Sequence, residues 1–230
     1  MAAAQQIYHP TFYAGAWVFA PDSLSFGAVG GADLYADDSM FYTSTGEPRP
    51  DMVNPDGTYA DIQENYSHWE LASGGGAAQA RSGSYDGIWG MNFAMWGPRG
   101  ADGYAKPFFD LYEGVIDHSV TATMHEHDLA DHTVANWAEI GDDLRGKLRI
   151  WVGTKDQFLL NLSVESFEEH VAALEEPSPD FDITYVPDAL HVWWPEIGPG
   201  GGLLGILREM ALTMKDAAPT QADTWWYTAN

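Results

Sequence analysis

Two side chains in the last third of the chain have the types and the spacing of an acid–base pair. Asp156 directly follows one run of apolar residues, and His191 follows the next such run. In hydrolytic enzymes with this order, the carboxylate fixes the tautomer of the imidazole, and the imidazole takes the proton of a nucleophile. The alternative is structural, because an Asp after a strand is often a turn residue or a helix cap, and a lone His is often packed among aromatic rings.

Three short runs rich in aromatic and β-branched residues predict the buried strands that must position this pair: 15–20, 148–152 and 181–186. Between the second and the third run, apolar residues recur on one helical face over 163–174. A strand, a helix and a strand in succession are typical of a parallel sheet, whose strand ends collect catalytic groups. A last helix over 203–215 is apolar on most of its surface, and we expect it to pack on the sheet.

The stretch 27–114 is dense in Gly, Asp, Tyr and Trp and has little sustained periodicity. We expect a long excursion from the sheet with short helices at most, which acts as a lid or substrate wall or else as an inert covering. Five aromatic residues could line an acyl or phenolic site, although core packing explains them equally well. They are Tyr85, Trp89, Trp96, Trp193 and Trp194. The fold class predicted for 1–230 is therefore a single α/β domain with flanking helices and this irregular excursion.

A histidine cluster offers a different chemistry. On a continuous helix, His125, Asp128 and His132 would share one face, and imidazole with carboxylate is a common ligand set for transition metals. The cluster lacks the H-E-x-x-H spacing, and the structural interpretation, which we favour, is that Asp128 caps a helix that runs on to Trp137. We therefore assign no metal ligand and no cofactor, and we keep a metal-dependent enzyme as the second hypothesis.

The amino-acid composition restricts the classes of molecule that the protein is expected to bind. The net charge of −24 repels nucleic acid and anionic lipid, and it favours an acidic, salt-adapted surface over an ordinary acidic one. The absence of cysteine excludes disulfides and a thiol nucleophile. We find no signal peptide and no apolar run of membrane-spanning length, so we expect a soluble protein of open localisation with a small-molecule substrate.

Several multi-residue segments carry a family resemblance: 6–22, 32–35, 96–103, 144–153 and 156–161. Over 5–195 the chain resembles the C-terminal part of large bacterial esterase-like proteins similar to the enterochelin esterase and esterase D group. The resemblance implies a partial α/β-hydrolase fold and ester hydrolysis of the Ser-Asp-His type. It also implies that Asp156 is the acid and His191 the base. This chain departs from the family at Val192, where such proteins commonly have glycine.

The serine nucleophile is missing from this pattern. Such proteins carry a G-x-S-x-G turn that feeds a helix, and 2–7 resembles the body of that helix, but the motif occurs nowhere in the sequence. We therefore expect a fragment, whose serine lies upstream of Met1, or a degenerate relative. An in-frame G-x-S-x-G encoded upstream of Met1 would identify the chain as a fragment. Without a nucleophile, triad catalysis falls by several orders of magnitude.

The strands that precede such a turn are missing as well, so one apolar edge of the sheet is expected to lack a partner. We expect a homo-oligomer that covers this edge. A third hypothesis is therefore a non-catalytic oligomeric scaffold protein that has kept the hydrolase framework.

Overall fold

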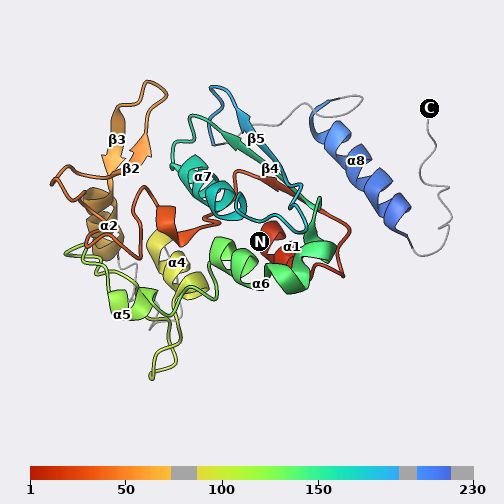
Figure 1. The fold of residues 1–230 in the computed structure, drawn as a ribbon. Helices are drawn as coiled ribbons and strands as arrows, with labels where there is room; N and C mark the ends of the chain where they lie inside the picture. The colour runs from red at the N-terminus through yellow and green to blue at the C-terminus, as the bar shows by residue number, and fades with distance from the viewer. Residues whose placement is uncertain (74–86, 192–200, 219–230) are drawn as a thin grey trace.

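The computed structural model describes residues 1–73, 87–191 and 201–218 of the 230-residue chain. Figure 1 shows a sheet with helices around it on one side of the molecule and a region of short elements on the other. The elements in chain order are α1 (Ala2–Tyr8), β1 (Ala16–Phe19), the 3-10 helix η1 (Phe26–Ala28), β2 (Pro50–Val53), β3 (Tyr59–Ile62), α2 (Gln63–Ala72), α4 (Ile88–Trp96), α5 (His118–Thr121), α6 (Leu129–Leu144), β4 (Leu148–Gly153), α7 (Leu160–Val171), β5 (Asp182–Val186) and α8 (Gly202–Ala217).

The main sheet is parallel and three-stranded, in the order β1-β4-β5. All three strands and the helix between β4 and β5 were predicted from the sequence. β4 lies in the centre and is buried along most of its length, as its apolar residues require. The mixed α/β class with a helix-flanked parallel sheet is therefore confirmed.

Helices α1, α6 and α7 cover one face of this sheet (Figure 1). Their apolar residues form one core with the inward side chains of the strands, including Val18 of β1 and Ile150 of β4. Trp17 and Arg149 alternate with these residues and therefore point to the opposite face. On that face, Arg149 Nε lies 2.8 Å from Glu209 Oε1 of α8.

Helix α8 has the predicted position in the sequence, but its packing on the sheet is only partial. Its buried residues are Gly205 and Ile206. Several large apolar side chains stay exposed: Leu203, Leu204, Leu207, Leu212 and Met214. No helix among the described residues is long and apolar enough to cross a membrane.

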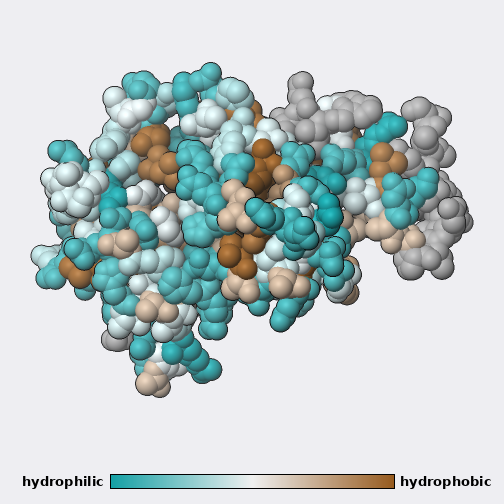
Figure 2. Space-filling view, in the orientation of Figure 1, coloured by the Kyte–Doolittle hydropathy of each residue, from teal (hydrophilic) through white to brown (hydrophobic). Residues whose placement is uncertain are grey.

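The excursion 27–114 has a core of its own. Ten of its buried residues, among them Trp89 and Phe108, form a cluster with Phe26, Ile116, Val120 and Met124 from just outside the excursion. The expectation of short helices at most was wrong, because β2 and β3 also form an antiparallel hairpin here. The turn signal at 54–57, Asn-Pro-Asp-Gly, explains the hairpin, since Gly57 takes φ +85°. Hydrophilic residues cover most of the face seen in Figure 2.

Candidate active site

Asp156 and His191 stand on two neighbouring loops at the carboxyl ends of β4 and β5. Because the two strands pair in parallel, both loops leave the same edge of the sheet. Asp156 Oδ2 lies 3.0 Å from His191 Nδ1. The structure therefore brings together the two residues that the sequence order paired.

The environment of the pair differs between acid and base. The Asp156 side chain is fully buried, whereas that of His191 is 30% exposed. Asp156 Oδ1 accepts the Phe158 N–H at 2.9 Å, which leaves Oδ2 for the imidazole. A carboxylate only accepts hydrogen bonds, so Nδ1 carries the proton and Nε2 of the neutral ring presents a lone pair. This tautomer is the one that a general base requires.

Hydrogen bonds join the two loops to each other. The Asp188 N–H donates to Thr154 Oγ1 at 2.8 Å, and the His191 N–H donates to Gln157 Oε1 at 2.8 Å. An ion pair between Lys155 and Asp188 adds a contact of 2.7 Å at the surface. The backbone of the histidine is thereby held independently of its ring.

Gly153, the last residue of β4, permits this close approach. A Cβ at this position would lie 2.2 Å from the carbonyl oxygen of Ala189, a backbone atom that cannot swing away. Glycine is therefore required where the two loops cross.

His191 lines a cavity of about 370 Å³, hereafter the histidine cavity. Its wall is largely apolar and comes from α4 and the loop after β4: Ile88, Trp89, Met91, Met95, Trp96 and Phe158. The Phe158 ring meets the imidazole edge to face, with ring centroids 5.0 Å apart. A histidine base beside an apolar cavity is suited to a substrate with an apolar group next to the reacting atom.

The aromatic wall expected from the sequence is present in part. Trp89 and Trp96 line the histidine cavity, and Trp89 also packs into the core of the excursion, with its ring centroid 4.9 Å from that of Phe109. Trp89 therefore both lines the cavity and packs in the core, whereas a role of this wall in holding an acyl or phenolic group stays a prediction. Tyr85, Trp193 and Trp194 lie outside the described residues.

The sequence analysis missed several polar residues of the cavity: Asp22, Ser23, Asp51, Gln63 and Asn92. Asp51 lies in β2 of the hairpin and Gln63 directly follows β3, and both line the same cavity as His191. Burial, then the nearby carboxylates of Asp61 and Glu70, raise the pKa of Asp51 to about 6. The hairpin turn was the available signal, but nothing in the sequence indicates that its ends meet the loop of His191.

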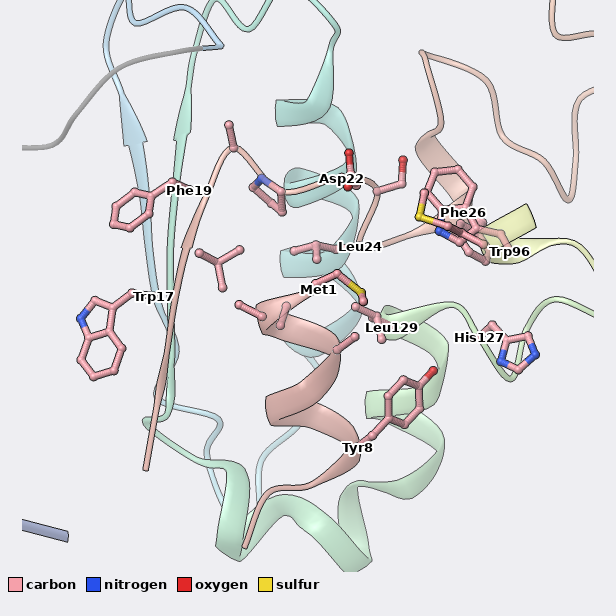
Figure 3. Close-up of a pocket in the computed structure, with 18 residues that line it drawn as sticks. Met1, Tyr8, Trp17, Phe19, Asp22, Leu24, Phe26, Trp96, His127 and Leu129 are labelled. Atoms are coloured by element: carbon pink, nitrogen blue, oxygen red, sulfur yellow. The ribbon is translucent and has the colours of Figure 1, made fainter. Parts of the chain in front are cut away.

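A second hollow of about 530 Å³, hereafter the β1 groove, runs between β1 and the N-terminal turn of α1 (Figure 3). It adjoins the histidine cavity, because Asp22, Ser23, Met95 and Trp96 line both. Among the described residues that line the histidine cavity, Ser23 alone has a hydroxyl group. It does not stand in a G-x-S-x-G turn.

The continuous helix that would align His125, Asp128 and His132 does not form. Helix α6 begins only at Leu129, and Asp128 is its N-cap, accepting the Ala130 N–H at 2.9 Å. His125 instead contacts Asp131, with Nδ1 and Oδ2 2.5 Å apart. The capping interpretation was correct. Among the described residues, no group of three or more His, Cys, Asp or Glu side chains is arranged to hold a metal ion.

Comparisons with protein-family models, with curated proteins and with solved structures find no match for this chain.

Proposed function

We propose that the chain carries the acid and the base of a serine-hydrolase centre that acts on carboxylic esters, on an α/β-hydrolase type of scaffold. The observation that supports the proposal is the 3.0 Å contact between Asp156 Oδ2 and His191 Nδ1 at the carboxyl ends of two parallel strands. His191 is the general base, and Asp156 orients it.

The chemistry assigned to the pair is proton transfer at Nε2 of His191. A serine hydroxyl gives its proton to Nε2 while its oxygen attacks the ester carbonyl, and the imidazolium returns the proton to the departing alkoxide. Water then repeats the sequence on the acyl-serine and releases the acid. Asp156 stabilises the imidazolium without taking a proton.

We propose that the serine is supplied from outside these 230 residues, because no G-x-S-x-G turn occurs in them. The β1 groove supports this placement, because it adjoins the histidine cavity and follows an open strand edge. Ala16 and Ala20 donate their N–H groups toward β4, so the backbone groups of Trp17 and Phe19 point the other way. No described residue pairs with those outward groups. A further strand that carries the serine in the loop at its end would pair with this edge of β1.

The same open edge supports self-association when no such strand is present. Edge strands with unpaired backbone groups add a further strand readily, and two copies of β1 satisfy each other. We therefore propose a homo-oligomer that buries the β1 groove.

Hydrolysis of p-nitrophenyl acetate tests the catalytic proposal on the chain as it stands. Because the chain has no serine in a G-x-S-x-G turn, we expect slow turnover in which His191 activates water. His191→Ala lowers this rate by about 10²-fold, the usual contribution of a general base, and Asp156→Asn lowers it by removing the orienting carboxylate. A chelator leaves the rate unchanged. His170→Ala on the exposed face of α7 is the matched control.

Equal rates for the wild type and His191→Ala would overturn the role of His191. Loss of activity with chelator or in His125→Ala would favour the metal-dependent alternative instead. Ser23→Ala separates two sources of the nucleophile: an unchanged rate agrees with a serine outside the chain, whereas a loss equal to that of His191→Ala shows that Ser23 is the nucleophile.

A further inference from the structure

The lining of the histidine cavity has acceptors without matching cations. Asp22, Asp51 and Gln63 belong to it, and no lysine or arginine occurs among the described residues that line the cavity. Gln63 is 2% exposed. Its amide nitrogen donates to the Pro50 carbonyl at 3.2 Å, and this fixes the amide so that Oε1 is an acceptor. That buried Oε1 has no hydrogen-bond partner among the described residues.

A buried acceptor without a donor costs free energy that a ligand donor would recover. The Asp51 carboxylate adds a negative charge close to the same apolar wall. Asp61 and Glu70 raise the local negative potential further, since both act on Asp51. A ligand with a positive charge and N–H donors satisfies all of these groups.

The apolar wall suits the same ligand. The indole rings of Trp89 and Trp96 attract a cation, and the flexible thioethers of Met91 and Met95 accommodate alkyl or aryl groups. Met91 and Met95 are each about half exposed on α4, so they adjust to the shape of the group that they cover.

We infer that the histidine cavity binds a primary ammonium group attached to an apolar body, with Asp51 and Gln63 as the acceptors. Resting on the proposed function, this inference names the substrate class as esters with an ammonium group in the acyl or alcohol part. The net charge of −24 draws such cations toward the protein, while the cavity selects among them.

Binding of three matched probes by isothermal titration calorimetry tests the inference without turnover. Phenethylammonium, 2-phenylethanol and phenylacetate share one aromatic body and differ in charge. We expect phenethylammonium to bind at least about tenfold more tightly than the alcohol, because a charge-assisted hydrogen bond contributes more than a neutral one. Phenylacetate binds most weakly. Equal affinity of the ammonium and the alcohol in the wild type would overturn the inference, whatever any variant does.

Asp51→Asn tests the acceptor directly. We expect the preference for ammonium over alcohol to shrink by about tenfold. The matched control is Asp142→Asn, which makes the same change of charge on the exposed side of α6. A loss in Asp142→Asn equal to that in Asp51→Asn would show that bulk charge, not the cavity, selects the cation.

Two further comparisons separate hydrogen bonding from charge, and ligand binding from catalysis. Benzyltrimethylammonium has the charge without N–H donors, and binding as tight as that of phenethylammonium would rule out Asp51 and Gln63 as hydrogen-bond acceptors. Ammonium selectivity that persists where the ester assay finds no role for His191 would leave the cavity assignment standing while the proposed hydrolase function fails.

Discussion

The two sides of the candidate site are built in different ways. On the side of the sheet, Asp156 and His191 stand on loops that hydrogen bonds and a glycine contact hold together. On the side of the excursion, the cavity wall is apolar packing from α4, and two buried polar atoms, Gln63 Oε1 and Trp89 Nε1, lack a partner among the described residues. The first side fixes geometry for proton transfer, whereas the second leaves unmet bonding capacity for a ligand.

The largest expected effect comes from breaking the sheet side at Gly153. Gly153→Ala places a Cβ against the Ala189 carbonyl, and we expect it to lower the free energy of unfolding by about 3 kcal/mol because of overpacking against backbone. Denaturant titration measures this change. Gly27→Ala, whose added Cβ would meet only side-chain atoms at 3.4 Å or more, is the control. A neutral Gly153→Ala would show that the two loops tolerate separation.

Asp128 joins the two sides, and its loss is expected to rank second. The carboxylate accepts N–H groups from Phe26 and Ala130 and the Tyr35 hydroxyl. Asp128→Ala leaves buried donors unsatisfied and removes a helix cap, so we expect a loss of about 2 kcal/mol in thermal or denaturant unfolding. Asp117→Ala, an exposed cap on α5, should cost about half as much. Equal costs would mean that Asp128 acts only as a cap.

On the excursion side, replacement of Asp51 is expected to raise the free energy of unfolding, whereas the two preceding substitutions lower it. Its pKa rises from 3.8 to about 6, so the folded state keeps a proton that the unfolded state releases. The Asp51 contribution therefore lowers stability as pH rises through about 4 to 6. Asp51→Asn removes this dependence and should stabilise the protein at neutral pH by about 1 kcal/mol, after a discount for partial exposure. Unfolding curves across that pH window measure it, and an unchanged slope would contradict it.

The smallest effect on folding is expected in the β1 groove. Ala4→Lys places a charge in the groove from α1 and should change stability by no more than about 0.5 kcal/mol. It should nevertheless weaken self-association by about tenfold, as seen by light scattering after size exclusion, because the charge would be buried in the contact. Ala173→Lys, at an exposed position in the turn that follows α7, is the control. A monomeric wild type would end the proposal of self-association.

The sequence predicted the sheet side well because its signals are local. Each strand is a short β-branched or aromatic run, and Asp156 and His191 follow two strands that pair in parallel, so their order along the chain is enough to predict proximity. The cap at Asp128 was also local.

The excursion side could not be predicted because it depends on contacts between distant segments. Gln63 and Asp51 reach the cavity only through the packing of the hairpin beside α4, and neither position has a spacing that indicates this. The partial packing of α8 was not predicted for the same reason, because the apolar pattern predicts a helix but not the surface on which the helix packs.

Gln157 gives the histidine a mechanical link to the hairpin. Its carbonyl oxygen accepts the Val53 N–H of β2 at 2.9 Å, and its side-chain oxygen accepts the His191 N–H. Asp51 stands two residues before Val53 on the same strand. A ligand that displaces Asp51 would therefore move β2, and through Gln157 it would move the backbone of His191. Binding at Asp51 is thereby coupled to the position of the general base.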